Sequence, residues 1–97
     1  MKYLIHINKI EDLKKKYNRT EDVYQMYCGT GIKNGKEMPL HNEIYCSFVI
    51  ENGNIKVLSG WHIGTEDFEW EYGEDDYTWV LEKYHPGITE QIKEMIK

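Results

Sequence analysis

Residues 65–79, TEDFEWEYGEDDYTW, combine seven carboxylates with five aromatic rings and contain no Lys or Arg. Glu82 extends the acidic run to eight acids within residues 66–82. Carboxylates attract cations, and Tyr and Trp rings supply large amphipathic contact areas at binding sites. This combination predicts a surface that binds a positively charged partner.

A strand over residues 66–72 would separate the charges from the rings. Alternation would place Phe68, Trp70 and Tyr72 on one face and the acids on the other, about 6.6 Å apart. That spacing is of the same order as the phosphate spacing along a nucleic-acid strand. The residues predicted to contact the partner are Asp67, Glu69, Glu71, Glu74, Asp75, Asp76, Trp70 and Tyr72.

A purely structural interpretation fits the same stretch. A half-buried edge strand packs its rings on the core, while its acids keep the edge soluble and unpaired. Asp75 or Asp76 would then cap a helix. The density of like charge is not explained in this way, because solubility alone is served by a surface of mixed sign.

The charge of the chain favours a basic protein as the partner. The net charge is −5, and residues 49–97 carry eleven Asp and Glu against four Lys. This half would repel nucleic acid and anionic membranes, so we expect neither to bind directly. The hypothesis is an inhibitor that occludes the basic surface of a nuclease or another nucleic-acid enzyme, as a toxin-immunity or phage anti-defence protein does.

Two other classes of function stay open. A nucleotide-binding module would use the aromatic rings for stacking and a set of basic residues for phosphate. Alternatively, a homodimer or larger homo-oligomer would use the sheet edge or the aromatic face as its own interface. The basic set consists of Lys14, Lys15, Lys16, Arg19, Lys33 and Lys36.

Motifs for catalysis, metals and cofactors fail on spacing. GTGIKNGK, residues 29–36, lacks the four-residue gap and the Ser or Thr of a phosphate-binding loop. The acids from Asp67 onward miss the glycine and glutamate positions of an EF-hand. Neither cysteine nor any histidine lies at a metal-ligand spacing, and no nucleophile motif is present. We therefore expect no enzyme activity, no cofactor and no metal.

The strands and helices predicted around the acidic stretch indicate a single domain, residues 1–97, of the α+β class. We expect an antiparallel sheet of three to four strands with helices packed on one face. Residues 2–7, 43–51 and 54–63 alternate as strands, and Asn52-Gly53 predicts a tight hairpin. Residues 20–28 fit either a helix or a strand, and residues 29–35 are predicted to be a loop.

Three helices are predicted from caps and apolar spacing. The first is capped by Asn8 and ends near Asn18, with Ile10, Leu13 and Tyr17 on one side. The second precedes Pro86-Gly87 and carries Val80, Leu81 and Tyr84, although residues 76–84 are also compatible with a strand. The third covers residues 89–97 and would bury Ile92, Met95 and Ile96.

Composition predicts a cytoplasmic protein. Cys28 and Cys46 have no paired spacing, no secretory signal is apparent at the N-terminus, and no apolar run reaches the length of a bilayer. The chain has no Ala and a single Arg, whereas Lys, Ile, Asn and Tyr are plentiful. That bias is associated with AT-rich genomes of bacteria and their phages.

Overall fold

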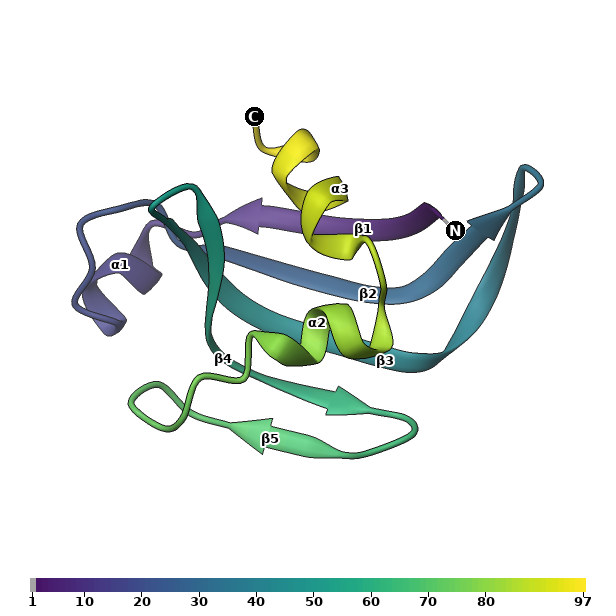
Figure 1. Cartoon of the computed structure of the whole chain (residues 1–97). Coiled ribbons are helices and arrows are strands. Elements are labelled where there is room, and N and C mark those ends of the chain that lie inside the picture. The colour runs from purple at the N-terminus through teal and green to yellow at the C-terminus, as the bar shows by residue number, and fades with distance from the viewer. Residues whose placement is uncertain (1) are drawn as a thin grey trace.

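The computed structural model describes residues 2–97 as a five-stranded antiparallel sheet with three short helices (Figure 1). Each strand pairs with its neighbour in sequence, in the order β1-β2-β3-β4-β5. The α+β class is therefore confirmed, with five strands instead of three or four. The elements are β1 (Lys2–Lys9), α1 (Asp12–Lys16), β2 (Tyr24–Lys33), β3 (Lys36–Glu51), β4 (Asn54–Ile63), β5 (Phe68–Trp70), α2 (Trp79–Tyr84) and α3 (Ile88–Met95).

Two Asn-Gly turns connect the three central strands. Asn52 and Gly53 have φ of 53° and 77°, the positive values that a two-residue hairpin needs, and Asn34-Gly35 repeats them between β2 and β3. The loop predicted for residues 29–35 is therefore wrong, because residues 29–33 belong to β2. Residues 24–28 are strand, since pairing on both sides satisfies their backbone.

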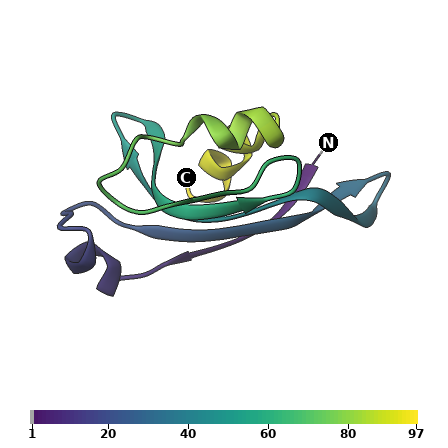
Figure 2. The ribbon, with the colours of Figure 1, turned by 90° about the horizontal axis from the view of Figure 1, so that it is seen from below.

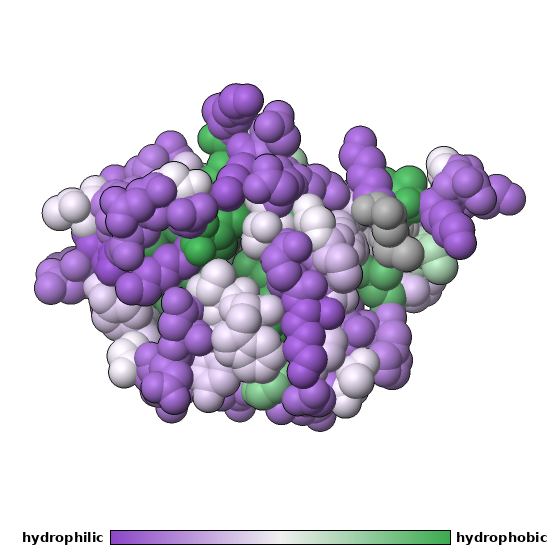
Figure 3. All heavy atoms as spheres, in the orientation of Figure 1, coloured by the Kyte–Doolittle hydropathy of each residue, from purple (hydrophilic) through white to green (hydrophobic). Residues whose placement is uncertain are grey.

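Helices α2 and α3 cover one face of the sheet (Figures 1 and 2). Met26 and Phe48 from the strands are buried there with Leu81 and Ile92 from the helices. In Figure 3 hydrophilic residues occupy most of this side, with hydrophobic ones in scattered areas. No helix within residues 2–97 is long and apolar enough to cross a bilayer.

Helix α1 lies on the opposite side of the sheet (Figure 2). Leu13 of this helix and Tyr17, which directly follows the helix, pack against Val23, Val49 and Leu58 in a second apolar cluster. The predicted apolar stripe is therefore confirmed. The helix itself is only five residues long, so it covers one end of this face and leaves the rest uncovered.

Two details of the predicted helices are wrong. Asn8 does not cap α1, because β1 continues through it to Lys9 and Asn8 pairs with Gln25. Met95 is 49% exposed instead of buried. The buried stripe of α3 follows a four-residue repeat through Ile88 and Ile92, and Met95 falls outside it.

A side chain from α3 pairs with the outer edge of β1. The Tyr3 amide donates to Oε1 of Gln91 at 2.9 Å, and Nε2 of Gln91 donates to the Tyr3 carbonyl at 2.5 Å. The carboxamide thus replaces a neighbouring strand at this point. It attaches the C-terminal helix to the N-terminal strand and blocks part of an edge that another chain would pair with.

Replacing Gln91 with Leu should lower the free energy of unfolding by about 1–3 kcal/mol, because Leu has a similar volume but leaves both backbone groups of Tyr3 without partners. Urea unfolding measures the change. The control is Glu94→Leu, an exposed position on the same helix, which should change stability little. Equal effects of the two substitutions would contradict the role of the carboxamide.

Candidate functional site

Several carboxylates of the acidic stretch have local partners. Glu66 forms an ion pair with Lys83 at 3.2 Å. The amide of Gly64 donates to Asp67 at 3.2 Å, and the amide of Glu71 donates to Glu74 at 2.8 Å. Asp67 and Glu74 therefore satisfy backbone amides in the turns on either side of β5, whereas Glu66 links the first of these turns to α2.

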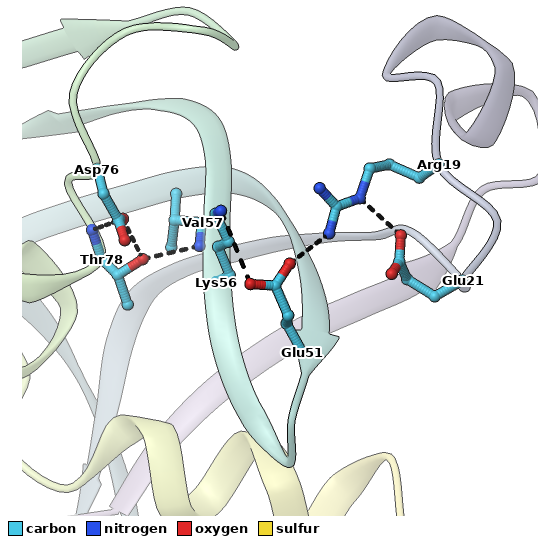
Figure 4. A network of polar contacts seen from close by, with 7 residues as sticks. All are labelled: Arg19, Glu21, Glu51, Lys56, Val57, Asp76 and Thr78. Carbon is cyan, nitrogen blue, oxygen red and sulfur yellow. Dashed lines mark hydrogen bonds and ion pairs between the residues drawn. The ribbon is translucent and has the colours of Figure 1, made fainter.

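Asp76 and Glu82 also have structural roles. Asp76 accepts hydrogen bonds from the amide and hydroxyl of Thr78, whose oxygen in turn accepts from the amide of Val57 at 2.9 Å (Figure 4). Glu82 accepts from the amides of Gly87 and Thr89, each at 3.0 Å, at the start of α3. Partial burial opposes ionisation of Glu82, but these bonds outweigh it and lower its pKa.

Three of the predicted contact acids are left without a side-chain partner among residues 2–97, namely Glu69, Glu71 and Asp75. All three are exposed. Glu69 and Glu71 lie within and just after β5, whereas Asp75 lines a separate hollow with Lys56 beside β4. The continuous acidic row predicted from the sequence is therefore reduced to two neighbouring carboxylates at the β5 edge.

Trp70 and Tyr72 do not share a face. Trp70 is 3% exposed, and its ring packs in the main core with its centroid 5.5 Å from that of Tyr77. Tyr72 is 46% exposed, and its ring lies 5.2 Å from that of Tyr17 on the α1 side. The prediction that Trp70 and Tyr72 lie on the same face of one strand is wrong, because β5 ends at Trp70.

An aromatic row crosses the face that α2 and α3 leave uncovered. The register aligns Tyr27 of β2 with Tyr45 of β3, Tyr45 with Trp61 of β4, and Trp61 with Glu69 of β5. His6 of β1 is opposite Tyr27 at the other end. Sequence patterns alone did not reveal this row, because its rings, Tyr27, Tyr45 and Trp61, lie on three different strands. The available signal was the alternation within β2, β3 and β4.

The rings of this aromatic row are in contact and only partly buried. Tyr45 and Trp61 stack with centroids 5.9 Å apart and an interplanar angle of 16°. Tyr27 meets Trp61 edge-on at 6.3 Å, and its hydroxyl donates to Glu43 at 2.5 Å. That hydrogen bond, with some burial, raises the pKa of Tyr27.

A pocket of about 500 Å³ opens at the Trp61 end of the row, between α1 and β5. It brings together the carboxylates of Glu69 and Glu71, one lysine and aromatic residues from several separate segments of the chain. We call it the aromatic pocket. Its lining residues are Lys16, Tyr17, Tyr45, Ser59, Gly60, Trp61, Glu69, Trp70, Glu71 and Tyr72. The hydroxyls of Tyr17 and Ser59 lie 2.5 Å apart and are hydrogen-bonded to each other.

The basic residues predicted for phosphate binding do not form one cluster. Lys14 pairs with Glu11 and Asp22. Arg19 bonds to Glu21 at 2.6 Å and to Glu51 at 2.7 Å (Figure 4), and both contacts raise its pKa. Lys33 and Lys36 flank the β2–β3 turn, at the opposite end of the sheet from α1 (Figure 1).

The thiols are unsuited to nucleophilic chemistry. Burial raises the pKa of Cys28 to about 11 and that of Cys46 to about 12, so both are protonated at neutral pH. Among residues 2–97 no group of three or more His, Cys, Asp or Glu side chains is placed to hold a metal ion.

Comparison with known proteins adds no relative. No family model, curated protein or solved structure matches the chain.

A pair of buried histidines lies at the C-terminal end of α2. His85 is 1% exposed, and its Nε2 lies 3.0 Å from the carbonyl oxygen of Asn42, to which it donates. His62 is fully buried, 6.0 Å from His85, and Nδ1 of His62 lies 2.7 Å from the carbonyl of Glu66. Burial, partly offset by the bond to Asn42, lowers the pKa of His85 below its ordinary 6.5.

This lowered pKa predicts acid sensitivity. Below pH 6.5 the unfolded chain protonates His85 while the folded chain does not, so the stability present above pH 6.5 is lost as the pH falls. The loss is at most about 1.4 kcal/mol per pH unit. Urea unfolding at pH 7.5, 6.5 and 5.5 should show a smaller loss for His85→Gln than for the wild type. His41→Gln, at an exposed site, should lose stability with falling pH as the wild type does. If His85→Gln also loses as much stability as the wild type, His85 is not the source of the acid sensitivity.

Proposed function

We propose that the protein binds a basic partner protein through the uncovered sheet face, and that it thereby occludes a surface that otherwise holds nucleic acid. The observation that carries the proposal is the pairing of Trp61 with Glu69 across β4 and β5. It places partner-free carboxylates directly beside a partly exposed aromatic row.

This arrangement has the composition of a protein-protein interface in which aromatic hot-spot residues lie at the centre and charged residues at the rim. Tyr and Trp dominate protein-protein hot spots because they offer large contact areas with few rotatable bonds. Tyr45 and Trp61 already stack on each other, so little side-chain entropy is lost when a partner covers them. The Glu69 and Glu71 carboxylates lie at the margin, where charge contributes to the rate and specificity of association.

The charge of the protein supports a nucleic-acid-binding enzyme as the partner. Such enzymes present Lys and Arg in a cleft that holds phosphates, and a net charge of −5 steers this protein toward them. An inhibitor that covers the cleft competes with the nucleic acid. This is the mode of action expected of a nuclease immunity protein or of a phage protein directed against a host defence nuclease.

Charge reversal tests the proposal. The wild type and the double variant Glu69→Lys/Glu71→Lys are immobilised, and the proteins that each retains from a host lysate are quantified by mass spectrometry. A nucleic-acid-binding protein should be retained by the wild type and lost from the variant. With the purified partner, the affinity should fall at least about tenfold, because like charges then face each other.

The control is Glu90→Lys/Glu94→Lys, which makes the same change of net charge on α3 and should retain the partner. A competition experiment completes the test: addition of the protein should displace labelled nucleic acid from the purified partner. Partner binding that is unchanged by the Glu69→Lys/Glu71→Lys variant, or a partner that still holds its nucleic acid when saturated, would refute the proposal.

A further inference from the structure

We propose that the aromatic pocket binds the guanidinium group of an arginine side chain. The arginine belongs to the basic partner, so its source rests on the proposed function. The recognition chemistry rests only on the residues that line the pocket, and it can be tested without any partner.

The rings of the pocket suit a planar cation. Tyr17, Tyr45, Trp61 and Tyr72 all line it; Tyr17 follows α1, Tyr45 and Trp61 lie on two strands, and Tyr72 lies in the segment after β5. A guanidinium stacks on such faces through its delocalised charge and is more weakly hydrated than an ammonium, so it costs less to desolvate. The volume of about 500 Å³ lies within the ~300–1,000 Å³ of small-ligand sites.

The charges of the pocket favour a cation over an anion. Glu69 and Glu71 line it and have no ion pair or hydrogen-bond partner for their carboxylates among residues 2–97. Lys16 is the single basic residue in the lining, so the local charge is negative. Carboxylates beside stacked rings match the guanidinium, which bonds in its plane while its faces stack.

Lys16 shows how a cation is accommodated at this site. Its Nζ lies 5.5 Å from the centre of the Tyr17 ring, a cation–π contact at the rim of the pocket. Lys16 has no ion pair with any residue in the described part of the chain, so it acts as a weak internal competitor for the same rings. Removal of the Lys16 charge should therefore strengthen the binding of a cation and weaken the binding of phosphate, so the two kinds of ligand can be distinguished.

The experiment is a titration of ¹⁵N-labelled protein with N-acetyl-arginine amide, followed through the indole N–H signals of the three tryptophans. The Trp61 signal should move, with a dissociation constant in the millimolar range. The signals of Trp79, which is exposed elsewhere, and of the buried Trp70 side chain should move less. N-acetyl-citrulline amide has the same shape without the charge, and it should bind at least about fivefold more weakly.

Two conservative variants test the charges without disturbing the core. Glu69→Gln/Glu71→Gln should weaken the binding of N-acetyl-arginine amide several-fold, and Lys16→Gln should strengthen it. Glu90→Gln/Glu94→Gln should leave it unchanged. Equal shifts with arginine and citrulline amides, no shift of Trp61, or weaker binding after Lys16→Gln would each overturn the inference. Tighter binding of inorganic phosphate, lost with Lys16→Gln, would assign the pocket to an anion instead.

Failure of this inference can be told apart from failure of the proposed function. If the arginine amide does not bind but charge reversal still releases a nucleic-acid-binding partner, the interface exists and uses another anchor. If the arginine amide binds at Trp61 but no partner depends on Glu69 and Glu71, the pocket is a guanidinium site and the occlusion proposal is wrong.

Discussion

Both faces of a five-stranded sheet carry apolar side chains that need cover, but the helices of this protein cover only one face fully. Helices α2 and α3 bury the side that carries Met26 and Phe48. Helix α1 has five residues and shields only the end of the other side, over Val49 and Leu58. The remaining area carries Tyr45 and Trp61. Amphipathic rings tolerate such partial exposure better than aliphatic side chains do, and they are also the side chains most useful for binding.

The edges of the sheet impose the second constraint. Backbone groups at an edge need partners, and side chains supply them here: Gln91 pairs with Tyr3 beside β1, and Thr78, itself held by Asp76, accepts from Val57 beside β4. Much of the acidic stretch acts in the same way, in turns and at the start of α3. Most of these acids therefore serve to hold the fold together. Glu69 and Glu71 at β5 differ from them, because their carboxylates have no partner within residues 2–97.

The proposed binding surface lies where these two constraints act on the same part of the sheet. The short α1 leaves the aromatic row uncovered, and the short β5 lets the chain turn after Trp70, so that Tyr72 reaches Tyr17. The result is a pocket with rings from separate parts of the chain and carboxylates at one side.

Local patterns in the sequence were sufficient for the hairpin at Asn52-Gly53, the strands around it, the buried stripe of Leu13 and Tyr17, and the mixed α+β class, because turn chemistry and periodicity act over a few residues. They could not show which strand face the helices cover, where β5 ends, or which acids are used in turns. Those outcomes depend on contacts between distant residues. The alignment of Tyr27, Tyr45, Trp61 and Glu69 follows only from strand register, so the tertiary structure alone assembled the candidate site.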